Sequence, residues 1–238
     1  SEQFTKYIQH LVSRLEAEDV SVLVYEEYFN FLENNVEFKN PPIIFDSYES
    51  LKDQADYLFS IGGDGTLLGS VTLVRDSNIP ILGINTGRLG FISSIATDQI
   101  ESAITDVLNN NYEIKSRTLL SLETENNLFG KVNFALNEVA VVKKDTSSMI
   151  RIDAFLGDEF LNSYWADGIV IATPTGSTGY SLSCGGPIII PETDNVIITP
   201  IAPHNLNVRP IVLSDKNSIK LKVADKDQLA LVSLDSRF

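Results

Sequence analysis

A glycine-rich segment around one carboxylate is the first part of the sequence able to do chemistry. It consists of Gly62-Gly63-Asp64-Gly65-Thr66 and lies between an apolar stretch, Tyr57 to Ile61, and a run with helical spacing, Leu67 to Arg75. Glycines let a backbone approach a ligand closely, and the N–H groups at the start of a helix favour a phosphate. We therefore expect Asp64 to face a substrate hydroxyl or a metal, with a helix N-cap in a tight turn as the alternative.

Two common nucleotide-binding loops do not fit this segment. A Walker A loop ends in Gly-Lys-Ser/Thr, and the dinucleotide fingerprint needs its glycines at a wider spacing. Residues 62–66 follow neither pattern. The segment thus argues against the standard ATPase and dehydrogenase classes.

A second polar cluster runs from Thr173 to Ser183. It holds six Ser or Thr hydroxyls and the phenol of Tyr180 within eleven positions. Hydroxyls both donate and accept hydrogen bonds, which suits an adenine, a ribose and a pyrophosphate, and the ring of Tyr180 offers a face for stacking. A polar loop that only caps a helix is the alternative interpretation.

Two further polar pairs lie in or beside apolar strands. Asn137-Glu138 falls within the apolar run Phe134 to Val142, and Asp167-Gly168 stands at the mouth of another strand. Polar groups buried in a strand need hydrogen-bond partners. Both pairs therefore join the candidate site residues.

Helix and strand signals alternate in the first part of the chain and predict a parallel sheet. Helical spacing covers Phe4 to Leu15, and Asp46 with Glu49 resembles a capping box that opens a short helix. The other expected elements of this part are strands at Val20–Tyr25, Tyr57–Ile61 and Ile81–Ile84 and helices at Leu67–Arg75 and Ile100–Leu108.

After Leu108 the pattern becomes that of β-structure. The expected strands are Leu119–Glu123, Phe134–Val142, Ile150–Leu156, Gly168–Ala172, Val196–Ile201, Ile219–Val223 and Leu229–Leu234, with one short helix at Thr178–Ser183. The sequence therefore predicts two domains, an N-terminal α/β domain over residues 1–95 and a C-terminal β-rich domain over residues 96–238.

Composition and charge exclude several classes of partner. The 238 residues carry a formal net charge of −14, which disfavours binding to nucleic acid. No apolar run reaches the roughly 20 residues that a membrane span needs. One cysteine, Cys184, and two histidines, His10 and His204, make neither an internal disulfide nor a convincing transition-metal site. We expect a cytoplasmic protein with no nucleic-acid or membrane partner.

The polar motifs, taken in order, resemble those of the ATP-dependent NAD kinase family over nearly the whole chain from Leu51 onward. The motifs are Gly62–Thr66, Gly83–Phe91, Asn137-Glu138, Asp167-Gly168, Thr173–Tyr180, Gly185–Pro187 and Pro200–His204. Gly-Gly-Asp-Gly is shared with lipid kinases and phosphofructokinases, whereas Thr-Pro-Thr-Gly-Ser-Thr is far more specific. Tyr164–Gly168, and Gly179 where many members carry Ala, resemble the bacterial branch that contains Bacteroidetes enzymes.

The resemblance implies a fold, a reaction and a set of roles. It implies an α/β class, in which a Rossmann-like α/β domain precedes a β-rich, β-sandwich domain with the active site between them. It also implies transfer of the γ-phosphoryl group of ATP to the 2′-hydroxyl of the adenosine ribose of NAD, with Asp64 as proton acceptor. NAD would then be bound by Asp64, Gly65, Asn137, Glu138, Asp167, Thr175, Thr178, Gly179, Tyr180, Ser181, Leu182 and Ser183, and the ATP phosphates would face Gly62, Gly63 and Thr66.

The resemblance further implies a divalent ion, usually Mg²⁺, and a homo-oligomer, either a tetramer or a dimer. ATP would carry most of the ion's coordination, because the sequence offers no protein-only cage. Two rival functions are kept. A lipid kinase of the diacylglycerol or sphingosine type would need an apolar or basic membrane-facing surface, and a regulator would bind NAD without turnover.

Overall fold

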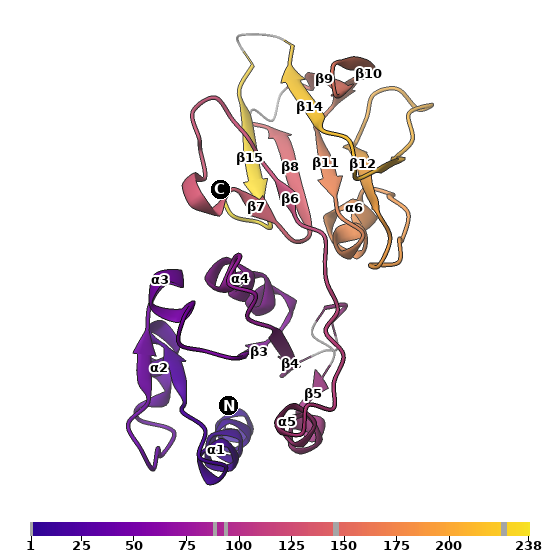
Figure 1. Cartoon of the computed structure of the whole chain (residues 1–238). Helices are drawn as coiled ribbons and strands as arrows, with labels where there is room; N and C mark the ends of the chain where they lie inside the picture. Colours follow the sequence, from indigo (N-terminus) through magenta and orange to yellow (C-terminus); the bar gives the residue numbers. More distant parts are fainter. Residues whose placement is uncertain (1, 88–89, 93–94, 145–147, 225–227) are drawn as a thin grey trace. The chain divides into compact units, whose positions relative to one another are not determined.

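A computed structural model describes residues 2–87, 90–92, 95–144, 148–224 and 228–238. The contacts between residues divide the chain into two compact units, Ser1–Ile114 and Lys115–Phe238. Figure 1 shows helices mixed with short strands in the first unit and a mainly β second unit. No helix of the described residues is long and apolar enough to cross a membrane.

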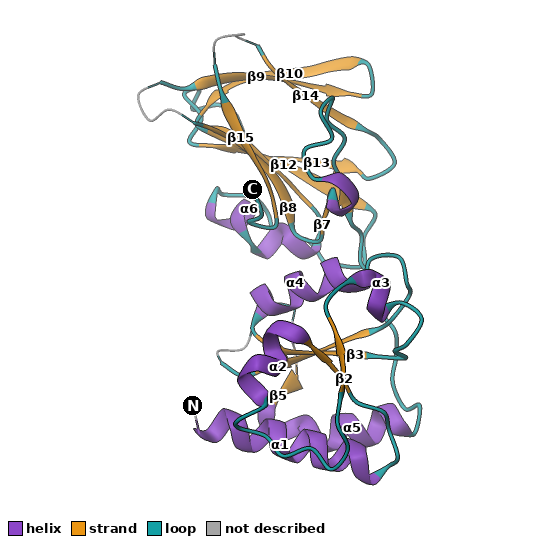
Figure 2. Ribbon diagram, turned by 90° about the vertical axis from the view of Figure 1, so that its left-hand side faces the viewer, coloured by secondary structure: helices purple, strands orange, loops and turns teal. Residues whose placement is uncertain are grey.

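The first unit alternates helices with parallel strands, as the sequence predicts. Strand β1 pairs with β2, and β3, β4 and β5 form a second parallel sheet. The helices pack around these strands (Figure 2). The elements are α1 (Glu2–Ala17), β1 (Leu23–Tyr25), α2 (Glu26–Leu32), β2 (Ile43–Phe45), α3 (Tyr48–Leu51), β3 (Leu58–Gly62), α4 (Asp64–Val74), β4 (Ile81–Asn85), β5 (Ile95–Ala96), a 3-10 turn (Thr97–Gln99) and α5 (Ile100–Leu108).

Helix α5 belongs to the first unit, although the sequence-based boundary at 95/96 places it in the second. Its buried residues Ile100 and Ile104 join a core cluster with Leu11 of α1 and Ile84 of β4. The apolar face of α5 therefore has its partners among the preceding elements. By contacts the division falls between Ile114 and Lys115 instead.

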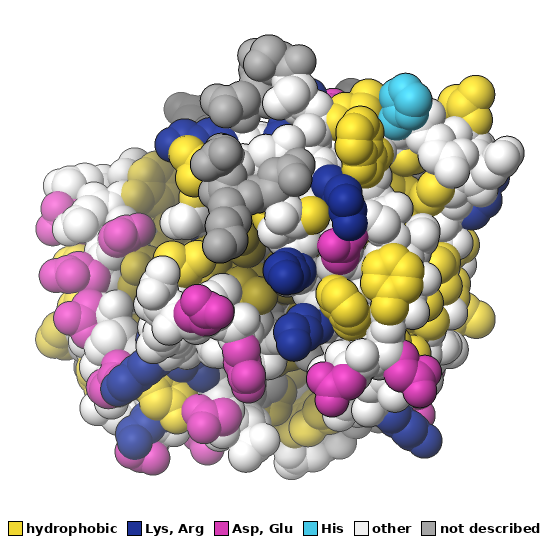
Figure 3. Space-filling view, turned by 90° about the horizontal axis from the view of Figure 1, so that it is seen from above, with side chains coloured by type: hydrophobic (Ala, Val, Ile, Leu, Met, Phe, Trp, Pro, Cys, Tyr) yellow, Lys and Arg dark blue, Asp and Glu magenta, His cyan; other side chains and the backbone are white. Residues whose placement is uncertain are grey.

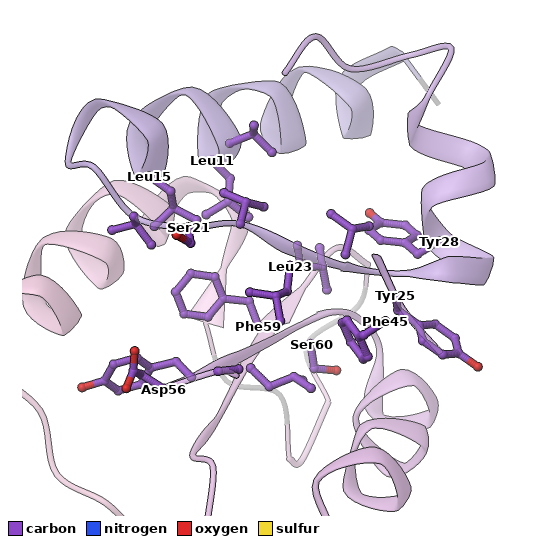
Figure 4. Close-up of a pocket in the computed structure, with 18 of the residues that line it drawn as sticks. Leu11, Leu15, Ser21, Leu23, Tyr25, Tyr28, Phe45, Asp56, Phe59 and Ser60 are labelled. Atoms are coloured by element: carbon purple, nitrogen blue, oxygen red, sulfur yellow. The ribbon is translucent and has the colours of Figure 1, made fainter. Parts of the chain in front are cut away.

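A cavity of about 990 Å³ separates β1 from β3 inside the first unit. No hydrogen-bonded ladder joins these two strands in the described part of the chain. Figure 4 shows apolar side chains from α1, β1, β2 and β3 around the cavity, among them Leu15, Leu23 and Phe59. Tyr28 and Ser60 also line it, and the hydroxyl oxygen of each is buried without a hydrogen-bond partner among the described residues. Burial raises the pKa of Tyr28 to about 12.

The second unit is a β-sandwich, which confirms the predicted fold. A five-stranded antiparallel sheet in the order β13-β12-β11-β8-β15 faces a three-stranded sheet in the order β10-β9-β14. Alternate residues of both sheets meet in one core, such as Ile169 of β11, Ile152 of β9 and the fully buried Tyr164 of β10. The strands are β6 (Leu120–Ser121), β7 (Phe134–Ala135), β8 (Glu138–Lys143), β9 (Ile150–Leu156), β10 (Glu159–Ala166), β11 (Gly168–Ala172), β12 (Asn195–Ile201), β13 (Ile211–Ser214), β14 (Ile219–Val223) and β15 (Ala230–Leu234).

Three short helical segments complete the second unit. A 3-10 turn spans Gly130–Val132, a second spans Thr175–Thr178, and α6 (Tyr180–Ser183) follows it directly. Helix α6 contacts β11 of the five-stranded sheet. The hydroxyl-rich segment therefore forms a turn and a short helix beside a fully buried strand.

Several sequence-based expectations need correction. Helix α2 and strands β2, β10 and β13 were not expected, and helix α4 begins at Asp64 rather than Leu67. The N-cap of α3 is Ser47, not Asp46, because the Ser47 N–H donates to Ser50 Oγ at 3.1 Å. The Asp46 carboxylate instead accepts hydrogen bonds from both serine hydroxyls. The expected strand over residues 134–142 is divided into β7 and β8 around Asn137.

Candidate functional site

The Asp64 carboxylate is held by a second glycine-containing segment. Oδ2 accepts the backbone N–H of Phe91 at 2.9 Å, and Oδ1 accepts that of Ile92 at 3.3 Å. Gly90 permits this approach, because a Cβ there would lie 2.1 Å from Asp64 Oδ1. Gly63, not Asp64, is the N-cap of α4, so the structure does not support the interpretation of Asp64 as a cap. Asp64 is therefore the first residue of α4, and its side chain is oriented by backbone donors rather than used as a cap.

The residues expected to face ATP surround the start of α4. Gly63, Gly65 and Thr66 are exposed, and no atom of another described residue lies within 4 Å of a Cβ built at either glycine, chain neighbours aside. A Cβ at Gly62 would instead lie 2.2 Å from Thr66 Oγ1, so a side chain is not tolerated at the end of β3. The loop thus presents open backbone at the N-terminus of an 11-residue helix, where an anion is favoured.

In the second unit, Asn137 lies at the break between β7 and β8 and is clamped by the Thr-Pro-Thr-Gly turn. The backbone N–H of Thr173 donates to Asn137 O at 2.9 Å, and Thr173 Oγ1 donates to Leu136 O at 2.6 Å. A Cβ at Gly176 would lie 2.0 Å from Asn137 O. Two motifs that are distant in sequence, Asn137-Glu138 and the turn from Thr173, therefore form one structure.

Three buried oxygen atoms at this place have no hydrogen-bond partner among the described residues. They are Asn137 Oδ1, Glu138 Oε2 and Thr175 Oγ1. Buried polar atoms without partners are rare in folded proteins and costly. Such a group of acceptors and donors is expected where a polar ligand binds.

The Glu138 carboxyl is strongly perturbed. Burial, followed by the negative charge of Asp235, raises the pKa of Glu138 to about 7, and a backbone hydrogen bond from Tyr180 partly opposes that rise. The side chain therefore changes between its protonated and ionised forms near neutral pH. As a protonated acid it could donate a hydrogen bond, and as a carboxylate it could accept one.

Helix α6 contains both exposed and buried residues of the predicted NAD-binding set. Tyr180, Leu182 and Ser183 are exposed, and Gly179 approaches Glu138 so closely that a Cβ would lie 3.0 Å from Oε2. The Ser181 hydroxyl is buried and pairs with Thr199 Oγ1 at 2.8 Å. Ser181 thus anchors α6 to β12 while its neighbours remain accessible. Thr178 Oγ1 donates to Thr175 O at 3.4 Å.

Asp167 follows β10 and belongs to the same cluster. Lys143 Nζ lies 2.6 Å from Asp167 Oδ1. The pKa of Tyr180 is raised first by burial and then by electrostatic interaction with Cys184, Asp167 and Glu138. These three side chains therefore lie near the Tyr180 hydroxyl. Burial and Glu138 also raise the pKa of the Cys184 thiol, so the thiol stays protonated, as suits a packed residue. The structure thus brings together the predicted NAD-binding residues of the second unit.

Asp235 was missed by the sequence analysis. Its carboxylate accepts the backbone N–H groups of Leu136, Asn137 and Glu138 at 2.7, 2.8 and 3.1 Å. No motif spacing connects residues that are more than 90 positions apart, so the sequence carries no signal for this contact. Across the described ranges, no group of three or more His, Cys, Asp or Glu side chains could hold a metal ion.

Comparisons with known proteins match both units. Residues 2–112 match the ATP-NAD kinase N-terminal domain, and residues 136–237 match the ATP-NAD kinase C-terminal domain. The chain is 47% identical over 234 residues to the NAD kinase of Christiangramia forsetii, covering 98% of this chain and 80% of that protein. It is 50% identical over 232 residues to the NAD kinase of Flavobacterium psychrophilum, covering 97% and 79%.

Solved structures that are similar to this chain belong to kinases of the same kind as these sequence relatives. The yeast NADH kinase complexed with NADH has a TM-score of 0.86 at 27% identity and covers 98% of this chain and 72% of that one. The NAD kinase of Archaeoglobus fulgidus in complex with ATP has a TM-score of 0.69 at 28% identity and covers 92% and 84%. Both are similar to this chain in fold over most of its length.

The fold, the glycine-rich Asp64 loop and the hydroxyl-rich turn define a two-unit phosphotransferase of the nucleotide kinase class. Both units match domain models of one family, and the match to this chain spans more than three quarters of the length of each of these two relatives. The chain belongs to the NAD kinase family. This membership confirms the resemblance to the Bacteroidetes-type enzymes and argues against both the lipid kinase and the regulator without turnover.

Proposed function

We propose that this chain transfers the γ-phosphoryl group of ATP to the 2′-hydroxyl of the adenosine ribose of NAD, giving NADP and ADP, and that the residues described above carry the reaction. The observation that carries the residue assignment is the group of unpartnered buried atoms at Asn137, Glu138 and Thr175. The neighbouring backbone holds these residues in place, so they need little rearrangement to bind a nucleotide.

Asp64 is proposed as the proton acceptor. A ribose hydroxyl has a pKa far above that of a carboxyl group, so Asp64 cannot remove its proton early in the reaction. Phosphoryl transfer has a loose transition state in which position and charge dominate. The N–H groups of Phe91 and Ile92 orient the carboxylate, which is proposed to hold the hydroxyl in line and to take the proton as the new bond forms.

The NAD side is proposed to consist of Gly65 and of the cluster in the second unit. Asn137, Glu138 and Thr175 would hydrogen-bond the nucleoside, and the exposed ring of Tyr180 would stack on a base. The remaining proposed contacts are Asp167, Thr178, Gly179, Leu182 and Ser183, with Ser181 supporting α6 from within.

The ATP phosphates are proposed to bind Gly62, Gly63 and Thr66 at the N-terminus of α4, where Gly63 presents open backbone. Mg²⁺ enters as part of the MgATP substrate and offsets the repulsion between the anionic substrates and the site carboxylates. The residues of the chain then need only to orient the phosphates and exclude competing water.

An end-point assay tests the proposed reaction. The purified chain is incubated with NAD and MgATP, and the product is reduced by an NADP-specific dehydrogenase and read as NADPH absorbance. We expect signal only with both substrates present. Formation of phosphorylated diacylglycerol or sphingosine in place of NADP would contradict the proposal, as would NAD binding in calorimetry with no turnover.

The chain is further proposed to act as a cytoplasmic homo-oligomer, a tetramer or a dimer. Exposed apolar side chains on the second unit support this, among them Phe160 and Trp165 of β10, which are 61% and 58% exposed. Figure 3 shows exposed hydrophobic side chains beside Lys and Arg on one face of the molecule. Light scattering that gives the mass of one chain, 26.3 kDa, for the active protein would reject an oligomer.

A further inference from the structure

On one side, the segment Leu136–Glu138 has no strand partner for its backbone N–H groups among the described residues, and a single side chain accepts them. Three consecutive backbone N–H groups, those of Leu136, Asn137 and Glu138, converge on the carboxylate of Asp235 at 2.7, 2.8 and 3.1 Å. Hydrogen bonds from N–H groups to an ionised carboxylate are stronger than neutral ones. The conformation of the break between β7 and β8 therefore depends on Asp235.

The turn that carries Asp235 is itself fastened to the same region. The Asp235 N–H donates to Glu138 O at 3.1 Å. The Arg237 guanidinium donates to Val132 O at 3.0 Å and also to Phe134 O. Asp235 and Ser236 have φ values of 47° and 64°, in the left-handed region that residues other than glycine adopt in only a few per cent of cases. A conformation of this kind persists where the surrounding contacts over-determine it.

We propose that Asp235 is a positioning residue for NAD, which acts by fixing Asn137 and Glu138 in the conformation that presents their unpartnered oxygens to the nucleotide. The inference rests on the proposed function, because it assumes that this pair binds NAD. Asp235 needs no contact with the substrate. Its three N–H partners and the Thr173 turn hold the segment from two sides.

The charge of Asp235 gives the proposal a signature that a merely structural residue lacks. Among the described residues, the titratable groups that interact with Glu138 are Asp235 after β15, Tyr180 on α6 and Cys184 directly after α6. Asp167, which pairs with Lys143, acts on Tyr180. Of the residues that the structure describes, Asp235 alone raises the pKa of Glu138 by its charge. Removing this charge must therefore let Glu138 ionise at lower pH.

The test compares Asp235→Asn with a matched control, Asp153→Asn, in steady-state kinetics. Asp153 is also a hydrogen-bonded carboxylate of the second unit, on β9, but it pairs with Ser163 and Arg151. We expect Asp235→Asn to raise the KM for NAD about 10-fold or more, as loss of charge-assisted hydrogen bonds would. The KM for ATP should stay within about 2-fold, since only NAD binding is disturbed.

The pH profile of kcat/KM for NAD should also move to lower pH in Asp235→Asn and stay in place in Asp153→Asn. Asp235→Glu keeps the charge but displaces the carboxylate, so it should raise the KM for NAD without moving the pH profile. This variant replaces Asp235→Asn in the test if Asp235→Asn does not fold. An unchanged KM for NAD and an unchanged profile in folded Asp235→Asn would overturn the inference, as would equal increases in both KM values. Asn137→Ala and Glu138→Gln test the proposed NAD site independently of the role of Asp235. If these two variants leave the KM for NAD unchanged, the proposed NAD site itself is wrong.

Discussion

Asp64 has two carboxylate oxygens that accept backbone hydrogen bonds, so its charge and its position can be tested separately. Asp64→Asn keeps one acceptor oxygen and the side-chain shape but loses the base. We expect kcat to fall by about 10²- to 10⁴-fold and the KM for NAD to change by less than roughly 10-fold. Steady-state kinetics and a melting curve on the same preparation measure both quantities.

If Asp64 served only to hold the loop, the variant would lose stability but retain turnover in the folded fraction. The amide can still accept one of the hydrogen bonds from Phe91 and Ile92. Turnover within threefold of the parent would therefore remove Asp64 from the mechanism.

Glu138 makes the stability of the second unit depend on pH. The folded carboxyl has a pKa near 7 against 4.5 for the unfolded chain. Below pH 4.5 both states are protonated; as pH rises to 7 only the unfolded state ionises, so the free energy of unfolding falls. Relative to Glu138→Gln, the parent should lose about 2–3 kcal/mol over that interval.

The free energy of unfolding of the second unit is measured by urea unfolding, followed by the fluorescence of Trp165, the single tryptophan of the sequence. Each unfolding free energy is taken at pH 5 and pH 8 for both proteins. A parent whose stability rises relative to Glu138→Gln would show that Glu138 is ionised in the fold, contrary to its burial.

Single residues of the site differ in how well the sequence predicts them. Asp64 stands out because three glycines surround it, and Asn137-Glu138 because polar residues interrupt an apolar run. Asp235 has neither signal, since its importance arises from hydrogen bonds to residues 97 to 99 positions away. Ser181 lies inside the predicted motif, yet only the fold reveals that its hydroxyl points to Thr199.

At the scale of elements, the segment after β4 controls the orientation of Asp64. In Gly90→Ala the new Cβ would lie 2.1 Å from Asp64 Oδ1, so the carboxylate must move. We expect kcat to fall by about 10²-fold, because small misplacements of a reacting group cost that much. Gly87→Ala in the same segment is the matched control, since the nearest described atom to its Cβ is Asn85 Oδ1, at 3.9 Å. Equal activities of the two variants would contradict a positioning role for the segment.

Helix α6 offers a second test at this scale. Tyr180→Ala removes an exposed ring and leaves the buried anchor at Ser181 in place. We expect NAD binding to weaken by about 1–3 kcal/mol while the free energy of unfolding changes by less than about 1 kcal/mol. Calorimetry and thermal melting measure the two effects, and unchanged affinity would exclude Tyr180 from the site.

The elements were predictable where periodicity or a long apolar run marks them. Helix α1 has apolar residues at helical spacing, and β11 is an unbroken apolar run. Strand β2 has three residues, too few to show alternation. Strand β8 begins at Glu138 and not at Phe134, because hydrogen bonds to Asp235 and Thr173 replace the ladder around Asn137. Local pattern therefore predicts most elements but not their interruption by distant contacts.

At the scale of the whole molecule, the two units should differ in local stability. Strands β1 and β3 each have one hydrogen-bonded neighbour and face the cavity on the other side, whereas β11 is paired on both sides and fully buried. Local opening is easiest where few buried contacts and single ladders hold a segment. We expect amide hydrogens of β1 and β3 to exchange faster than those of β11, as read by mass spectrometry of peptides. Equal protection of β3 and β11 would contradict this.

The contacts of Asp235 also bear on how the protein reaches its active form. The hydrogen bonds from Leu136, Asn137 and Glu138 join residues 97 to 99 positions apart, so they close nearly the whole second unit into one loop. Contacts of such sequence separation form late, because the chain between them must be ordered first. The β9–β10 hairpin that carries Trp165 is local by comparison. The pairing of β15 with β8 places Leu234, the neighbour of Asp235, in the core beside Val139, so the core itself is completed by contacts of the same separation. If this segment binds NAD as proposed, affinity for NAD appears together with the last part of the core.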